Sequence, residues 1–397
     1  MNITVERVET FVVRLPPRAD FRWLSLSRPL GEFILCRVEG DDQVGWGEVV
    51  GLRDWGDRDG RRHGETPATV TSVVHDQLAP GLLGHAVSLG ALPARLDELI
   101  IGHPYAKALL DIALHDLVGR SCGVPVYTLL GGAVRDSVPV AHMLGLMPVE
   151  EALAEARRAV NDGVRALQIK GGGDVARDCE VVRELRAEHG DDLWLRLDAN
   201  AGYRGRARAR HAIGALADAG ADLIEQPLLG VLNLAELRRD SPVALMADEA
   251  CWSPADALDL VARRAVDVLS VYVGKAGGLA RAREVCAIAH AAELPHDLNG
   301  ALELGIGNAA NWHLAVASPA ELLPSVIPVN APAGAFPTTT AGRYFDDDVV
   351  KAPWSMKDGN VRGPHGPGLG VEVDEEKIRH YCDQRRATST NLEVADG

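Results

Sequence analysis

One repeating unit fills the sequence from Val138 to about residue 328, and it restricts the fold more than any other feature. Each unit has a short apolar run, a polar turn and an amphipathic stretch. The apolar runs are 138–147, 164–170, 193–198, 222–226, 243–248, 266–275, 294–299 and 322–328; the helical stretches between them are 149–162, 174–189, 205–219, 232–240, 254–264, 278–292 and 305–317. Strands and helices that alternate at this spacing predict parallel strands, and about eight of them predict a closed barrel.

The segment before the barrel has a different pattern. Residues 5–13 and 33–49 alternate apolar and polar positions, which predicts an antiparallel meander, and from Pro67 to Ala133 the apolar period becomes helical. Loops at about 15–30 and 51–65 are rich in Arg, Asp and Trp, and each is either a lid over a site or a solvated surface loop. The Gly-, Pro- and Val-rich segment 354–374 is predicted to rejoin the N-terminal sheet.

Composition narrows the class of protein. The formal net charge of −15 argues against nucleic acid as a partner. No apolar run reaches membrane-spanning length, and the N-terminus lacks the apolar core of a signal peptide. The six cysteines are scattered without paired spacing, which argues against a zinc motif and a disulfide framework. We therefore expect a cytoplasmic protein without a membrane or nucleic-acid partner.

Polar residues recur at the ends of five successive apolar runs. They are, in order, Lys170, Asp198, Glu225, Asp248 and Lys275. In a barrel of parallel strands these ends meet on one face, so the residues are expected to share a site. Three converging carboxylates repel one another, and a hard divalent cation such as Mg²⁺, with Mn²⁺ as a substitute, relieves the repulsion. The alternative is a set of helix N-caps and ion pairs.

The two lysines suggest proton transfer. Only six of the 41 basic residues are lysine, and lysine, unlike arginine, can lose its proton when its pKa is lowered. Lys170 and Lys275 follow the second and sixth strands, on opposite sides of a barrel. A divalent cation would stabilise the enolate formed when a proton α to a carboxylate is removed, with one lysine taking the proton and the other returning it.

These residues resemble a known family, the enolase superfamily, and within it the muconate lactonising enzyme (muconate cycloisomerase)-like subgroup of the mandelate racemase/muconate lactonising enzymes. The likeness runs the whole length. It is carried by Gln168-Ile-Lys170, Leu197-Asp-Ala-Asn200, Ile224-Glu-Gln-Pro227, Ala247-Asp-Glu249, Gly274-Lys-Ala-Gly-Gly278, Leu302-Glu-Leu-Gly-Ile-Gly307 and the tail 364–374.

The resemblance implies a fold and an assembly. The fold is α/β, a modified TIM barrel (β/α)7β at 134–345. An N-terminal α+β capping domain at 1–133 bears the lid loops, and the segment 346–397 returns to complete it. Relatives in this superfamily are commonly dimers or octamers, so a homo-oligomer is expected.

The resemblance also implies roles for site residues. Asp198, Glu225 and Asp248 correspond to the metal ligands, and Lys170 and Lys275 to the acid and base. Glu303 falls where the subgroup carries a glutamate beside the substrate carboxylate, while Asn299 and Tyr272 replace the histidine and aspartate of the mandelate racemase type. The expected substrate contacts are Gln168, Asn200, Glu303, Trp23 and Asn299.

One position departs from the family pattern. The family has Lys-x-Lys after the second strand, and the first lysine helps to neutralise the substrate carboxylate, whereas this chain has Gln168. Glutamine donates a hydrogen bond but supplies no charge. Arg18, Arg22 or Arg53 on the lid loops are candidates to replace it.

The leading hypothesis is therefore a Mg²⁺-dependent racemase, epimerase or cycloisomerase acting on a small-molecule carboxylate. A dehydratase that eliminates a β-hydroxyl by the same enolate route is the nearest alternative. More distant ones are a barrel glycosidase using Glu225 and Asp248, a Schiff-base lyase using Lys170 or Lys275, and a catalytically silent binding protein.

Overall fold

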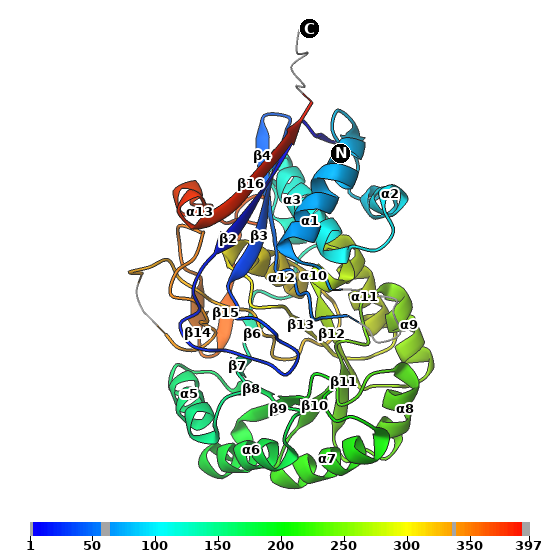
Figure 1. Ribbon diagram of the computed structural model, residues 1–397, viewed down its shortest axis with the longest axis vertical. Coiled ribbons are helices and arrows are strands. Elements are labelled where there is room, and N and C mark those ends of the chain that lie inside the picture. The colour runs from blue at the N-terminus through cyan, green and yellow to red at the C-terminus, as the bar shows by residue number, and fades with distance from the viewer. Residues whose placement is uncertain (1–2, 57–63, 336–338, 391–397) are drawn as a thin grey trace.

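The computed structural model describes residues 3–56, 64–335 and 339–390. Its largest sheet has seven parallel strands that neighbour one another in chain order and curl into most of a barrel (Figure 1). The strands are β7 (His142–Leu144), β8 (Ala166–Lys170), β9 (Trp194–Asp198), β10 (Leu223–Glu225), β11 (Ala244–Ala247), β12 (Val268–Tyr272) and β13 (His296–Asn299).

The eighth barrel position is irregular. Of the predicted strand 322–328, only two isolated parallel bridges form, Leu322 with His296 and Ser325 with Val140. Pro324 and Pro328 have no N–H to donate to a ladder, which explains why regular pairing does not develop there. The two bridges nevertheless join the first and last strands, so the expected (β/α)7β arrangement is present.

Helices surround the strands on the outside of the barrel (Figure 1). They are α5 (Val149–Asn161), α6 (Val175–His189), α7 (Arg206–Ala219), α8 (Val231–Arg239), α9 (Pro254–Ala262), α11 (Leu279–Ala291) and α12 (Gly305–Ala317). The predicted strand 266–275 ends early, at Tyr272, and Val273–Ala276 forms the short helix α10 instead. Gly277 and Gly278 follow it with positive φ, a conformation that glycine adopts freely and that turns the chain toward α11.

A second layer, here called the cap, lies at one end of the barrel. Its antiparallel sheet has the order β16 (Cys382–Ser389), β2 (Arg7–Arg14), β3 (Glu32–Gly40) and β4 (Gln43–Val49), which confirms the predicted meander. α3 (Pro104–Cys122) packs closely on β4, because a Cβ at Gly45 or Gly47 would lie 2.2 Å from a carbonyl oxygen of that helix. The remaining cap elements are α1 (Pro67–Val73), η1 (Val74–Leu78), η2 (Ala79–Gly81), α2 (Leu92–Leu99), α4 (Val126–Leu129), α13 (Glu375–Tyr381) and the pair β1 (Ile3–Thr4) with β5 (Ala86–Val87).

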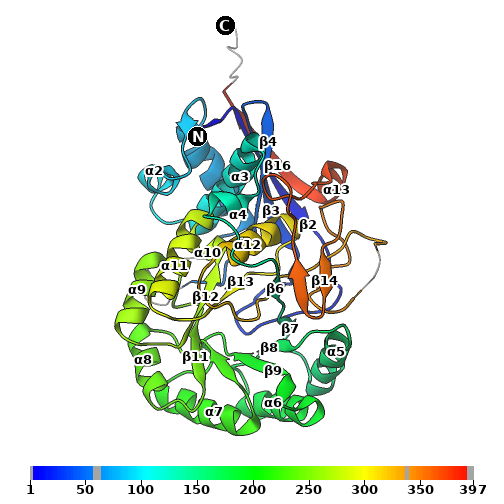
Figure 2. The same ribbon diagram turned by 180° about the vertical axis from the view of Figure 1, so that it is seen from behind.

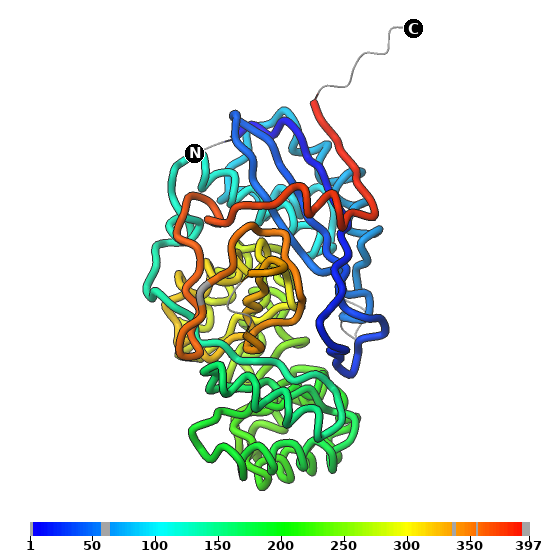
Figure 3. The backbone as a smooth tube through the Cα atoms, turned by 90° about the vertical axis from the view of Figure 1, so that its left-hand side faces the viewer, coloured from blue at the N-terminus to red at the C-terminus, as the bar shows by residue number. Residues whose placement is uncertain are grey.

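The C-terminal segment returns to the cap at a different place from the one predicted. Within 354–374, β14 (Ser355–Lys357) and β15 (Asn360–Arg362) pair with β6 (Val138–Pro139) rather than with the N-terminal sheet, so that prediction is wrong. The strand that joins the cap sheet is β16, which runs along β2 (Figure 3). Arg385 of β16 also forms an ion pair with the buried Glu9 of β2.

Helix α12 connects the cap to the barrel. It contacts both β4 and β13, and it lies between the two layers when the molecule is seen from behind (Figure 2). Glu48, near the end of β4, accepts hydrogen bonds from the backbone N–H groups of Leu304, at 2.6 Å, and Gly307, at 2.7 Å. The buried Asp348 accepts a third from Gly305 at 3.0 Å. Two carboxylates thus satisfy three of the four N–H groups that a helix leaves open at its start.

None of the helices in the described ranges combines sufficient length with sufficient apolar character to cross a membrane.

Candidate active site

Three of the predicted site residues lie side by side at the C-terminal ends of neighbouring strands. Lys170 of β8 is the register partner of Asp198 of β9, and Asp198 is the partner of Glu225 of β10. Register partners in a sheet point to the same face, so all three side chains point into the barrel. Asp248 directly follows β11, and Lys275 belongs to α10, which follows β12.

Asp198 is bound on both carboxylate oxygens. Lys170 Nζ lies 2.5 Å from Oδ2, and the side-chain amide of Asn200 lies 3.2 Å from the same oxygen. The backbone N–H of Asn200 donates to Oδ1 at 2.9 Å. Asn200 makes these contacts with a φ of 40°, because the chain turns sharply after β9. Asn200 therefore holds Asp198 rather than pointing away into solvent.

Glu225 is held by two amides and a guanidinium. Gln168 Nε2 donates to Oε2 at 3.0 Å, Arg196 Nε lies 3.3 Å from the same oxygen, and Asn299 Nδ2 lies 3.5 Å from Oε1. Arg196 is fully buried inside the barrel and also pairs with the buried Asp297 of β13. The sequence analysis missed this arginine. The arginine could have been found because it is a charged residue within the apolar run 193–198. It stands two positions before Asp198, and residues two apart in a strand point to the same face.

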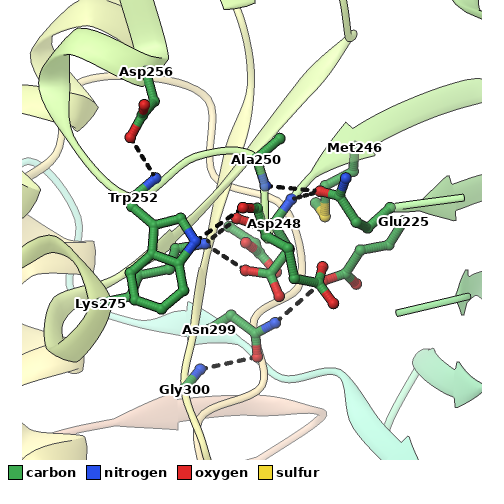
Figure 4. Close-up of polar contacts among 12 residues, drawn as sticks. Glu225, Met246, Asp248, Ala250, Trp252, Asp256, Lys275, Asn299 and Gly300 are labelled. Atoms are coloured by element: carbon green, nitrogen blue, oxygen red, sulfur yellow. Dashed lines mark hydrogen bonds and ion pairs between the residues drawn. The ribbon is translucent and has the colours of Figure 1, made fainter. Parts of the chain in front are cut away.

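Asp248 and Lys275 form the third contact (Figure 4). Lys275 Nζ binds the Asp248 carboxylate and also donates to its backbone carbonyl at 2.8 Å. The backbone N–H of Asp248 donates to Gln226 Oε1 at 2.9 Å, which fixes the start of this loop. Lys275 is therefore anchored at two points by one residue.

Burial and mutual repulsion set the electrostatics of the carboxylates. Burial, followed by repulsion from Asp198, raises the pKa of Glu225 well above its usual range. Burial also raises the pKa of Asp248, and the attraction of Lys275 offsets only part of this effect. Buried oxygen donors that repel one another in this way fit a hard divalent cation by their chemistry.

The three carboxylates are not drawn together around a common point. Within the described ranges, no three His, Cys, Asp or Glu side chains are already arranged as a metal-binding group. Asp198 faces Lys170, Asp248 faces Lys275, and Glu225 faces Gln168 and Arg196.

The lysines remain strongly basic in this arrangement. Burial lowers the pKa of Lys170, but the attraction of Asp198 and Glu225 outweighs it and leaves the pKa above the usual value. The pKa of Lys275 is raised in the same way, because attraction by Asp248 exceeds the effect of burial. Both pKa values are raised because a carboxylate faces each lysine directly.

Two tryptophans from the predicted lid loops cover the lysines. Lys170 Nζ lies 5.5 Å from the ring centre of Trp23, and Lys275 Nζ lies 5.6 Å from that of Trp55, within the range of cation–π attraction. The cavity left beneath the rings has a volume of about 30 Å³, which is enough for water but not for an organic acid. Substrate entry therefore requires at least one of these rings to move.

Lys170 and Lys275 do not have equal access to this cavity. Lys170 lines it together with Gln168, Asn200 and Asn299. Lys275 lies behind Asp248 and lines a neighbouring cavity of about 820 Å³ on the side of α9 and α3.

Glu303 lies behind the backbone of Gly300. A Cβ at Gly300 would be 2.1 Å from Glu303 Oε2, and Glu303 Oε1 accepts the N–H of Ala301 at 3.1 Å. Burial raises the pKa of the Glu303 carboxyl. Of the expected substrate contacts, Glu303 is thus the one that a backbone segment separates from the cavity.

The arginines proposed to replace the missing charge are engaged elsewhere. Arg18 pairs with Glu155, Arg22 is exposed and pairs with Asp20, and the exposed Arg53 is absent from the cavity wall. None of the three supplies a charge to the cavity in this structure.

Comparison with known proteins agrees with this geometry. Residues 8–131 match the family model "Mandelate racemase / muconate lactonizing enzyme, N-terminal domain", and residues 151–377 match "Enolase C-terminal domain-like". Muconate cycloisomerase 1 of Rhodococcus opacus is 34% identical over 96% of this chain and 99% of its own length. N-succinyl-L-Arg/Lys racemase of Bacillus cereus is 26% identical over 96% of this chain and 97% of its own.

Solved structures of enzymes from the same family are also similar to this chain. That of 2-chloromuconate cycloisomerase from Rhodococcus opacus 1CP has a TM-score of 0.84 at 27% identity and covers 96% of this chain and 100% of its own. That of L-Ala-D/L-Glu epimerase from Bacillus subtilis has a TM-score of 0.81 at 28% identity, with 93% and 98% covered. With strand-end carboxylates and lysines on a capped barrel, the chain belongs to the enolase superfamily of enzymes, in the muconate lactonizing enzyme-like subgroup of the mandelate racemase/muconate lactonizing enzymes.

Proposed function

We propose that this enzyme is an isomerase that requires a divalent cation and removes the proton α to the carboxylate of a small-molecule substrate, with Lys170 and Lys275 as base and acid. The observation that carries this proposal is the position of two buried lysines on the second and sixth strand ends, each bound to a different strand-end carboxylate. Side chains from opposite sides of the barrel can approach the two faces of one α-carbon.

The residues proposed to hold the cation are Asp198, Glu225 and Asp248. Their buried carboxylate oxygens suit Mg²⁺, and Mn²⁺ as a substitute. When bound, the cation supplies positive charge that stabilises the substrate oxygens as negative charge develops on them. Asn200 and Gln226 orient two of these ligands through the hydrogen bonds described above, and Gln168 orients the third.

The two lysines have distinct tasks in this proposal. Lys170 lines the cavity and is the nearer candidate to take or return a proton. Lys275 reaches the substrate only after its contacts with Asp248 are released, because it lies behind that residue. Return of a proton to the opposite face of the α-carbon gives racemisation or epimerisation. In cycloisomerisation, a carboxylate oxygen of the substrate adds to the substrate's own double bond, and a lysine gives a proton to the α-carbon of the resulting enolate; the reverse reaction begins with removal of that α-proton. The relatives bear names of both kinds, which supports this pair of outcomes over elimination.

Trp23 and Trp55 are proposed to shield the reaction from water. Removing water from around the lysines strengthens the electrostatic interactions within the site. Both rings come from the cap side of the molecule, so the barrel supplies the chemistry and the cap supplies the closure.

The test is exchange of the substrate α-hydrogen for deuterium, followed by ¹H NMR in D₂O with Mg²⁺. Lys170→Ala and Lys275→Ala should each lower exchange by about 10²–10⁴-fold, the usual contribution of a positioned acid or base. Lys351→Ala is the matched control, because Lys351 is exposed and forms its ion pair with Glu372, away from the cavity. Full exchange by either site variant would show the two-lysine assignment to be wrong.

Chelation separates this proposal from the glycosidase alternative. EDTA should abolish activity and excess Mg²⁺ or Mn²⁺ should restore it, whereas a carboxylate-pair glycosidase needs no metal. Activity that persists in EDTA would count against the proposed cation.

A further inference from the structure

The side chain that replaces the family's first lysine has no donor left for a substrate. Gln168 Nε2 donates to Glu225 at 3.0 Å and lies 3.4 Å from Asp198 Oδ2, and Gln168 is 1% exposed. A primary amide has two N–H donors, and both are directed at these carboxylates. Gln168 therefore orients the carboxylates and contributes neither charge nor a hydrogen bond to the substrate.

The buried cations around the site are already paired. Among the buried side chains that the structure describes there, the cations are Lys170, Arg196 and Lys275. Each of the three cations already faces a carboxylate of the protein. A bound divalent cation can offset one substrate carboxylate, but a second one would find no described cation to pair with.

The rest of the cavity wall is apolar. Apart from the strand-end residues and the small residues Gly300 and Ala301, its described side chains are Trp23, Leu52, Trp55, Met143, Leu302 and Val326. None of them carries a charge, and their only N–H donors are the two indole groups. Burying a carboxylate against such a wall without a partner costs far more than burying an alkyl or aryl group there.

From these three observations we infer that the substrate carries a single carboxylate and that its remaining part, which lies between the two tryptophans, is apolar. The inference rests on the proposed function and makes it more specific. It separates this enzyme from relatives whose names refer to muconate, which has a carboxylate at each end. Selectivity would arise from the cost of an unpaired charge rather than from the size of the cavity.

The test compares three acids with the wild-type enzyme and Mg²⁺ in D₂O. N-acetyl-L-methionine and N-acetyl-L-glutamate have side chains of similar length and differ in the second carboxylate, and cis,cis-muconate is the dicarboxylate named by the relatives. We expect kcat/KM for exchange of the methionine derivative to exceed that of the glutamate derivative by at least about tenfold, with no lactone formed from muconate.

The possible results distinguish an error in this inference from an error in the proposed function. Equal or faster exchange of the glutamate derivative, or lactone formation from muconate, would overturn this inference and leave the α-proton chemistry standing. Failure of all three acids to react would count against the proposed function itself.

A change in the wall supplies an independent check. Leu52→Lys places a cation on the half-buried lid loop, and Leu52→Met is the matched neutral control. If the apolar wall sets selectivity, the lysine variant should lower the ratio of methionine to glutamate exchange by about tenfold, and the methionine variant should leave it near the wild-type ratio. An unchanged ratio in a folded Leu52→Lys enzyme would overturn the inference.

Discussion

Replacement of Glu48 should show how strongly the cap holds the barrel residues next to the site. Glu48 belongs to β4, and its two oxygens accept the N–H groups of Leu304 and Gly307 at the start of α12. In Glu48→Leu, a change of similar volume, both N–H groups lose their acceptor in a fully buried place. An unsatisfied buried donor costs about 1–3 kcal/mol, so the variant should lose about 2–6 kcal/mol of unfolding free energy.

Glu48→Gln is the matched control. The amide keeps one carbonyl oxygen and loses one acceptor, so its cost should be about half, 1–3 kcal/mol. The measurement is the free energy of unfolding from urea titrations followed by circular dichroism. Because residues 300–302 line the cavity and lie two residues before α12, kcat/KM should fall in the same order as stability. Equal stability of the two variants, or a loss below about 0.5 kcal/mol in Glu48→Leu, would refute the reasoning.

Three further predictions concern buried groups. Burial raises the pKa of Asp348 from 3.8 to about 7, so the native state holds this proton more tightly than the unfolded chain does. The contribution of Asp348 to the free energy of unfolding is therefore largest below pH 3.8 and is lost as the pH rises through 7. Asp348→Asn should flatten that decline in melting temperature, and an unchanged slope would contradict the assignment. Arg196→Lys keeps the positive charge but loses the planar guanidinium that contacts Glu225. The affinity for Mn²⁺, measured by titration calorimetry, should therefore fall about 10–100-fold. An unchanged affinity would show that Arg196 does not orient a metal ligand. Gly300→Ala should displace Glu303 and lower kcat/KM, whereas Gly214→Ala, in α7 with open space around it, should keep activity, and equal activity would refute the close approach.

The barrel and its strand-end residues could be predicted from the sequence because both depend on local periodicity. Parallel strands covered by helices on one face are nearly continuous apolar runs, so their ends are marked by the first polar residues. Lys170, Asp198 and Glu225 were found in this way, and they are register partners in the structure. The eighth strand was predicted less well, because prolines that interrupt a ladder do not interrupt an apolar pattern.

Features that depend on tertiary contacts could not be predicted from the periodicity of the sequence. The positions of Trp23 and Trp55 over two lysines follow from loop paths that no periodicity encodes. Arg18 was an attractive candidate by residue type, yet it pairs with Glu155 on the outside of the barrel. Arg196 carried a usable signal, since a charge inside an apolar strand must find a buried partner, but the partner itself, Asp297, is 101 residues away.

The pairing of β16 with β2 has a consequence for the order of folding. Arg385 and Glu9, whose side chains form an ion pair between these strands, are separated by 376 residues. The edge of β2 stays open to other chains until nearly the whole polypeptide has left the ribosome, whereas each βα unit of the barrel finds its neighbour within a few tens of residues. The strands from β7 to β13 can thus pair in turn as they are made, whereas the cap sheet gains its edge strand last. The lid loops are made before the barrel, but the sheet from which they extend is completed only after the barrel strands have been synthesised.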